Sequence, residues 1–232
     1  MEELKKHIAS LKYEAPIRRE KININQQNFN NALFKKMTEM VKTRSSGSKS
    51  IQIIEEMKPT YSQIYRYLNN DYSLEEEKKH ISLQPWNLNK GLFLIGDFGR
   101  GKTLLLDLIF ESRQQLGILG RYTTAFELSK YYTQDQKTFE NLTNGECSFF
   151  LDEIGDEPKE TLHFGNAENV AYRAMKLFFD KVEKQSNKHR FFGTSNLGQG
   201  ELIDRYKERI WSRIVGNCNI IIFGDGIKDF RK

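Results

Sequence analysis

In the second half of the chain, short apolar runs alternate with longer segments whose apolar residues recur at helical spacing. Such runs predict buried strands, and a recurrence every three or four residues predicts amphipathic helices. The predicted strands lie at 92–95, 121–124, 148–151, 190–195 and 219–223, and the predicted helices include 102–115 and 170–184. Because strands that alternate with helices form a parallel sheet covered on both faces, the pattern predicts a three-layer α/β fold with a parallel five-stranded sheet.

Residues 1–43 predict a small helical N-terminal segment. Its apolar residues form one stripe at helical spacing: Phe29, Leu33, Phe34, Met37, Met40 and Val41. The stripe either packs on the main domain or docks into a groove of a partner protein, and its periodicity suits both. Residues 44–50 are small and polar and predict a linker, so the main domain is expected at 51–232. Its first part has a helical pattern with an interruption expected at Pro59.

Composition narrows the classes of protein. Hydrophobic residues make up 38% of the 232 residues and charged residues 29%, as in a globular protein, and the net charge of +5 weakly favours a polyanionic partner. No apolar stretch is long enough to cross a bilayer, so no membrane association is expected. The two cysteines, Cys147 and Cys218, form no C-x-x-C pair. We therefore expect a cytoplasmic protein without a disulfide framework or a zinc site.

The strongest chemical signal is a glycine-rich loop that follows the first predicted strand and opens a helix. It fits G-x-x-x-x-G-K-[ST], in which glycines let backbone N–H groups surround phosphates, lysine reaches the β- and γ-phosphates and the hydroxyl ligates Mg²⁺. The sequence therefore predicts a P-loop that binds ATP or a close relative. The predicted contact residues are Gly96, Asp97, Phe98, Gly99, Arg100, Gly101, Lys102, Thr103 and Leu104.

Two adjacent acids end the third predicted strand. An acid at the end of a buried strand next to a P-loop lies within reach of the metal, so Asp152 is predicted to coordinate Mg²⁺ together with Thr103. Glu153 is predicted to polarise the attacking water as a general base. The pair favours a nucleotide hydrolase, and the alternative is an acidic pair on the surface.

Two further elements follow in order. Thr194, Ser195 and Asn196 end the fourth predicted strand, where a polar side chain would hold the water or sense the γ-phosphate. Arg209 and Arg213 lie four residues apart and so share one helix face. One of them could reach the nucleotide of a neighbouring subunit as an arginine finger, and the alternative is a surface pair. The order of the motifs favours Arg213.

Together these elements resemble the AAA+ ATPases, and more narrowly the DnaC-type helicase loaders and the IstB-type transposition helpers. The resemblance covers residues from about 64 to the end of the chain. It is carried by residues 90–92, 152–155, 163–166, 194–197 and 208–214. On this match Asn196 takes the sensor-1 role and Arg213 is the finger, and both join Lys102 and Glu153 as catalytic residues.

The resemblance implies an ATPase that assembles on DNA as an ATP-bridged oligomer and loads a hexameric replicative helicase onto single-stranded DNA. The N-terminal segment would then bind the helicase. Aromatic and basic residues between the glycine loop and the acidic pair would contact single-stranded DNA, since bases stack on aromatic rings. These residues are Phe126, Lys130, Tyr131 and Tyr132. The alternative is a helix that packs its aromatic residues on the sheet.

The sequence departs from the family pattern in two places. Residues 224–232 follow the last predicted strand, so we expect no C-terminal lid domain, and its sensor-2 arginine is missing or replaced by Arg231. Many relatives carry an Arg-Tyr pair where this chain has Gln185 and Ser186.

Other functions stay open at this point. A transposition helper would share this chemistry and differ in its partner. A P-loop kinase would leave Asn196 and Arg213 unexplained. A nucleotide-gated adaptor that hardly hydrolyses ATP is disfavoured by Glu153.

Overall fold

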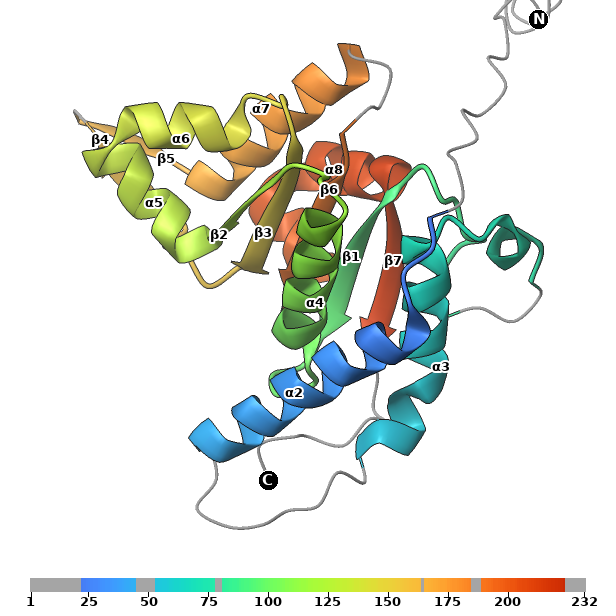
Figure 1. Cartoon of the computed structure of the whole chain (residues 1–232). Helices are drawn as coiled ribbons and strands as arrows, with labels where there is room; N and C mark the ends of the chain where they lie inside the picture. Colours follow the sequence, from blue (N-terminus) through green and yellow to red (C-terminus); the bar gives the residue numbers. More distant parts are fainter. Residues whose placement is uncertain (1–21, 45–52, 78–80, 164, 185–188, 224–232) are drawn as a thin grey trace, which may run out of the picture.

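Figure 1 shows the computed structural model of the protein, which describes residues 22–44, 53–77, 81–163, 165–184 and 189–223. Several sequence predictions fall outside these residues. They concern residues 1–21, the linker residues 45–50, Gln185, Ser186 and Arg231, together with the side chains of Met37, Met40 and Val41.

A five-stranded sheet forms the centre of the protein, and all its neighbouring strands are parallel. The strand order is β2-β3-β6-β1-β7, so β1 lies between two strands from the end of the chain. This confirms the predicted parallel five-stranded α/β fold. The strands are β1 (Gly91–Gly96), β2 (Gly120–Thr124), β3 (Ser148–Ile154), β6 (Phe191–Ser195) and β7 (Cys218–Phe223).

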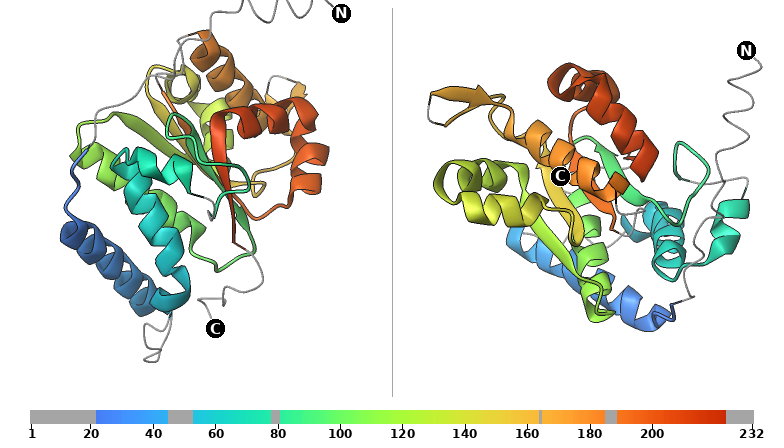
Figure 2. Two further views of the ribbon diagram at one scale, coloured as in Figure 1. Left: turned by 90° about the vertical axis from the view of Figure 1, so that its right-hand side faces the viewer. Right: turned by 90° about the horizontal axis from the view of Figure 1, so that it is seen from above.

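Helices cover both faces of this sheet, as Figures 1 and 2 show. Alternate side chains of a strand point to opposite faces. In β1, Leu92 and Leu94 join the core on one face, and Phe93 and Ile95 join the core on the other. The first face carries α2 (Gln26–Arg44), α3 (Ile53–Leu68) and α4 (Lys102–Gln115), and the second carries α5 (Ala125–Gln134), α6 (Gln136–Thr143), α7 (Val170–Lys184) and α8 (Gln199–Asn217).

Helix α2 packs on α4 and shares its core. Phe29 and Leu33 are buried in the same apolar cluster as the α4 leucines. Lys36 forms an ion pair with Glu111 of α4 at 2.6 Å. For Phe29 and Leu33 the structure thus shows the first of the two alternatives, packing on the main domain. Phe34, which the predicted stripe included, is 49% exposed.

Helix α3 continues through Pro59, so the predicted interruption there is wrong. A proline inside a helix removes one backbone hydrogen bond and crowds the preceding turn. Burial of Tyr61, Ile64, Tyr67 and Leu68 on the C-terminal side of the proline offsets that cost.

The sequence pattern missed three short elements. They are the 3₁₀ helix η1 (Tyr72–Glu76), helix α6, and an antiparallel hairpin of β4 (Thr161–His163) and β5 (Asn166–Glu168). The hairpin lies outside the main sheet, beside α5 (Figure 1). Its strands are three residues long, which is too short to show a periodicity of two. In the part of the chain that the structure describes, no helix is long and apolar enough to cross a membrane.

Candidate functional site

The glycine loop connects the carboxyl end of β1 to the start of α4. Gly99 and Gly101 have φ angles of 77° and 82°, a left-handed conformation that glycine adopts without strain. A Cβ atom on Gly96 would lie 2.3 Å from the carbonyl oxygen of Phe223, so no side chain fits there either. The backbone of this loop therefore requires glycine at all three positions.

Lys102 begins α4 and is only 6% exposed. Its Nζ donates hydrogen bonds to the carbonyl oxygens of Gly96 (2.6 Å) and Asp97 (2.8 Å) and to Oδ1 of Asn196 (2.7 Å). Asn196 directly follows β6, which pairs with β1. The strand order thus brings the predicted lysine and the predicted sensor residue into direct contact.

Asp152 lies at the end of β3 and is 2% exposed. Its Oδ1 accepts hydrogen bonds from Oγ1 of Thr103 (3.3 Å) and from the hydroxyl of Thr194. Its Oδ2 accepts a hydrogen bond from the hydroxyl of Tyr122 (3.0 Å). Hydroxyls from α4, β6 and β2 therefore hold this buried carboxylate, and the two predicted metal ligands, Thr103 and Asp152, lie together.

Glu153 follows in a conformation unusual for a residue with a side chain. Its φ angle is 55°, and the register between β3 and β6 shifts here, from Leu151 opposite Gly193 to Ile154 opposite Ser195. This shift is a β-bulge, a feature common next to active sites. The backbone N–H of Glu153 donates to Oγ1 of Thr194 (2.9 Å), and the residue is exposed. A left-handed glutamate costs ~1–3 kcal/mol, which surrounding contacts must offset.

The chemistry of these groups suits a magnesium nucleotide. Carboxylate and hydroxyl oxygens, as in Asp152 and Thr103, are the ligands that Mg²⁺ prefers. No group of three or more histidine, cysteine or acidic side chains with metal-ligand placement occurs among the described residues. In the loop itself, the guanidinium of Arg100 lies 3.9 Å from the carboxylate of Asp97.

Sequence reasoning missed two residues beside Asp152. They are Tyr122 of β2, whose hydroxyl donates to Asp152, and Asp107 of α4, whose charge acts on the same hydroxyl. Burial, together with the charges of Asp152 and Asp107, raises the pKa of Tyr122 well above its ordinary value, so the hydroxyl stays protonated. Burial also raises the pKa of Asp107, against the opposing effects of Tyr122 and Lys36. The one available signal was spacing, because Asp107 lies one helical turn after Thr103.

Arg213 lies away from the glycine loop of its own chain. It is near the end of α8, just before β7 begins at the edge of the sheet opposite the loop. Its guanidinium pairs with Asp180 (2.6 Å) and Glu183 (3.5 Å) of α7, and its side chain is 14% exposed. Arg209, four residues earlier, is exposed. The structure therefore does not bring Arg213 together with the other predicted catalytic residues.

The predicted DNA-contacting residues divide into two groups. Phe126 is 49% exposed, and Nζ of Lys130 lies 4.7 Å from the centre of its ring. Tyr131 is half-buried against the core. Tyr132 is 8% exposed, and its hydroxyl donates to Oε2 of Glu168 at 3.0 Å. The prediction that Tyr132 stacks on DNA bases is wrong, because its ring is part of the core.

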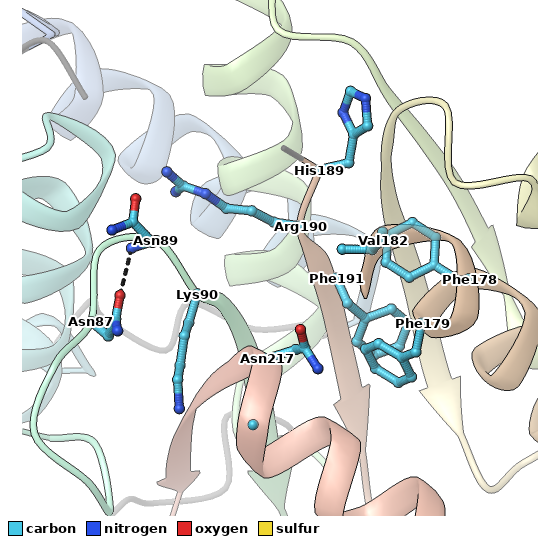
Figure 3. Close-up of a pocket in the computed structure, with 11 residues that line it drawn as sticks. Asn87, Asn89, Lys90, Phe178, Phe179, Val182, His189, Arg190, Phe191 and Asn217 are labelled. Atoms are coloured by element: carbon cyan, nitrogen blue, oxygen red, sulfur yellow. Dashed lines mark hydrogen bonds between the residues drawn. The ribbon is translucent and has the colours of Figure 1, made fainter. Parts of the chain in front are cut away.

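A hollow of about 110 Å³ lies at the amino ends of β1 and β6, at the opposite edge of the sheet (Figure 3). Ligands of open α/β sheets bind at the carboxyl ends. The two cations that line this hollow already have structural partners. Lys90 donates to the carbonyl of Val215 (2.9 Å), and Arg190 donates to the hydroxyl of Tyr67 (2.9 Å). We therefore place the functional site at the glycine loop.

Comparisons with known proteins support the fold. No family model and no curated protein matches the sequence. Among solved structures, the DnaC helicase loader is 16% identical, with a TM-score of 0.51 over 85% of this chain and 99% of the other. DnaI is 20% identical, with a TM-score of 0.50 over 73% and 84%. AMPPCP-bound DnaA from Aquifex aeolicus is 18% identical, with a TM-score of 0.46 over 72% and 46%.

The resemblance inferred from the motifs is confirmed for the fold. The glycine loop, the acid near the end of β3 and the asparagine after β6 occupy one edge of a sheet whose architecture matches these structures. The chain therefore has a three-layer α/β fold with a P-loop, and it shares this fold with the DnaC helicase loader and DnaI.

Proposed function

We propose that this protein is a Mg²⁺-dependent ATPase that assembles on DNA in the cytoplasm and helps load a replicative helicase onto single strands. The observation that carries the ATPase assignment is the convergence of Lys102, Thr103, Asp152 and Asn196 at the glycine loop. The fold shared with the DnaC helicase loader supports the more specific role.

Each residue at this edge then has a distinct task. The loop backbone and Lys102 hold the phosphates, and Thr103 and Asp152 hold the metal. The metal, when bound, neutralises charge on the transferring phosphate. Glu153, whose exposed side chain directly follows Asp152, accepts the proton of the attacking water. Asn196, which follows β6, orients that water or senses the γ-phosphate.

Assembly would complete the site. Because Arg213 lies at the opposite edge of the sheet from its own loop, we infer that it acts on the nucleotide of a neighbouring subunit. To do so it must give up its ion pairs with Asp180 and Glu183. Both carboxylates are partly exposed, so water can solvate them when the arginine leaves.

Two surfaces would serve the partners. The N-terminal segment that includes α2 would contact the helicase. Phe126 and Lys130 would contact single-stranded DNA, because an exposed ring beside an ammonium group offers stacking and charge together. Tyr131, half-buried in the same helix, would contribute its exposed edge.

Phosphate release with and without single-stranded DNA tests the proposal. We expect DNA to change ATP turnover or ATP affinity, and Phe126→Ala to weaken DNA binding by ~1–3 kcal/mol, the usual contribution of one stacked base. Leu119→Ala is the matched control, since Leu119 is 77% exposed in a loop with no proposed role. If DNA affects neither turnover nor affinity, the loader assignment is wrong. Capture of a transposase in place of a helicase from host extract would instead identify a transposition helper.

A further inference from the structure

The carboxylate of Asp152 is held differently at its two oxygens. Oδ1 accepts from Thr103, Thr194 and the backbone N–H of Glu153. Oδ2 accepts from the hydroxyl of Tyr122 at 3.0 Å. The direction of the second oxygen therefore depends on a residue that lies on a different strand and belongs to none of the motifs.

Aromatic packing fixes the ring that carries this hydroxyl. Tyr122 stacks on Phe150 of β3 with ring centres 6.3 Å apart and planes at 17°, and it meets Phe110 of α4 at 5.3 Å. Phe110 and Phe150 also contact each other edge to face at 5.0 Å. Because three rings lock one another, the hydroxyl has little freedom to move away from Asp152.

A second carboxylate, that of Asp107, lies near the same hydroxyl. The hydrogen bond of the Tyr122 hydroxyl goes to Asp152, while Asp107 lies near enough to contribute to the raised pKa of Tyr122, and Lys36 of α2 lies 4.0 Å from Oδ2 of Asp107. Lys36 contacts Glu111 of α4 as well, at 2.6 Å. A phenol has one proton to donate, so it can serve only one of the two aspartates at a time.

We propose that Tyr122 is a positioning residue of the metal site and that Lys36 of α2 sets how strongly Asp107 competes with Asp152 for its proton. This rests on the proposed function, since Asp152 is a metal ligand only in a magnesium-dependent nucleotide site. The ion pair with Lys36 holds the Asp107 carboxylate toward α2, so the Tyr122 hydroxyl stays hydrogen-bonded to Asp152. A partner that displaces α2 would release Asp107, turn the hydroxyl away from Asp152 and weaken metal binding. Binding of a partner to the N-terminal segment would thereby change Mg²⁺ binding at the nucleotide site.

Tyr122→Phe tests the positioning role, because it removes the hydroxyl and keeps the ring. The measurement is binding of a fluorescent ATP analogue to the full chain, titrated with Mg²⁺ and repeated in EDTA. We expect the Mg²⁺ concentration at half-maximal effect to rise roughly 10-fold, the lower end for residues that orient metal ligands. Binding in EDTA should be unchanged. Tyr132→Phe is the matched control, since it also removes a 3.0 Å phenol–carboxylate bond, but one to Glu168 and not to a predicted metal ligand.

The outcomes separate the two proposals. If the unaltered protein shows no Mg²⁺-dependent nucleotide binding, the proposed function fails. If it does and Tyr122→Phe has the same Mg²⁺ dependence while melting cooperatively, the positioning role alone is wrong. Asp107→Asn tests the competition. Its effect on the Mg²⁺ midpoint should shrink when combined with Tyr122→Phe, whereas an equal effect in both backgrounds would show simple charge attraction and overturn the relay.

Discussion

The polar network at the glycine loop and the ion pairs between α7 and α8 are built in different ways. At the loop, Lys102 and Asn196 are 94 positions apart in the sequence, and Thr103 and Asp152 are 49 apart. Between α7 and α8, Arg213 bridges two helices that already pack against each other. The first network joins elements from across the fold at one edge, and the second joins neighbours.

Burial separates the two networks further. Lys102 and Asp152 are 6% and 2% exposed, and burying such groups costs free energy that packing alone does not repay. Their hydrogen bonds converge on the glycine loop, which satisfies these buried groups and places them at one site. Asp180 and Glu183 are partly exposed, and ion pairs of that kind form at helix surfaces without any catalytic role. Hence the structure itself supports Lys102 and Asp152 as site residues, whereas the role of Arg213 rests on the order of motifs.

Arg213→Ala tests whether Arg213 acts in catalysis or only joins α7 to α8. If the side chain acts on a neighbouring subunit, ATP turnover should fall by ~10³-fold or more, while nucleotide binding stays intact. Mixtures with Lys102→Ala subunits should recover part of the activity, because each variant supplies what the other lacks. Arg209→Ala is the matched control, and steady-state phosphate release is the measurement.

A loss of turnover accompanied by a lower melting temperature and no recovery in mixtures would show that Arg213 only joins α7 to α8. A larger loss in Arg209→Ala would transfer the finger role to Arg209, which is exposed on the same helix.

Glu153→Gln tests the network at the glycine loop, where Glu153 is the proposed general base. Removing the general base should lower hydrolysis by roughly 10²-fold or more, because a positioned base typically contributes ~10²–10⁴. ATP affinity should not change, since the glutamine keeps the size of the side chain and the backbone N–H bond to Thr194. Asp156→Asn, an exposed acid three residues later, is the control. Retained turnover would exclude Glu153 from the mechanism.

The sequence predicted the sheet and the glycine loop because both are encoded locally. A buried parallel strand is a continuous apolar run, as in residues 92–95, and the loop needs glycine for its left-handed turns. The contact between Lys102 and Asn196 depends on β6 lying next to β1. Strand order is a property of the whole fold, so the motifs could suggest this contact but not derive it.

The partner of Tyr122 and the orientation of the α5 side chains could be learned only from the three-dimensional structure. Tyr122 reads in the sequence as an ordinary strand aromatic, and its acceptor becomes apparent only once β2 is aligned with β3, Thr124 opposite Asp152. In α5, Phe126 and Lys130 lie four residues apart on the exposed face, whereas Tyr132 lies on the opposite side and packs inward. Aromatic content alone could not distinguish these faces.

Lys102→Ala and Lys90→Ala compare two lysines that lie at opposite ends of β1. Loss of hydrogen bonds from a charged donor costs ~1.5–3 kcal/mol, so nucleotide affinity should fall by roughly 10- to 100-fold. Lys90→Ala removes a lysine whose Nζ caps the carbonyl of Val215, so it should lower the melting temperature and leave nucleotide affinity unchanged. Calorimetric titration with ATP checks both, and a matching loss of affinity in Lys90→Ala would place a ligand at the hollow in Figure 3.

Lys36→Met gives the smallest expected effect and the most specific one. A partly exposed ion pair contributes ~0.2–1 kcal/mol, so the Mg²⁺ midpoint for nucleotide binding should rise about 2-fold at low salt. Lys35→Met, an exposed neighbour on α2, should leave it unchanged. The direction in which the Mg²⁺ midpoint shifts distinguishes the two explanations. Loss of a positive charge by itself would attract Mg²⁺ more strongly and lower the midpoint. A rise therefore requires that Asp107, freed from Lys36, takes the Tyr122 hydroxyl from Asp152, and a fall would mean that α2 acts on the site by charge alone.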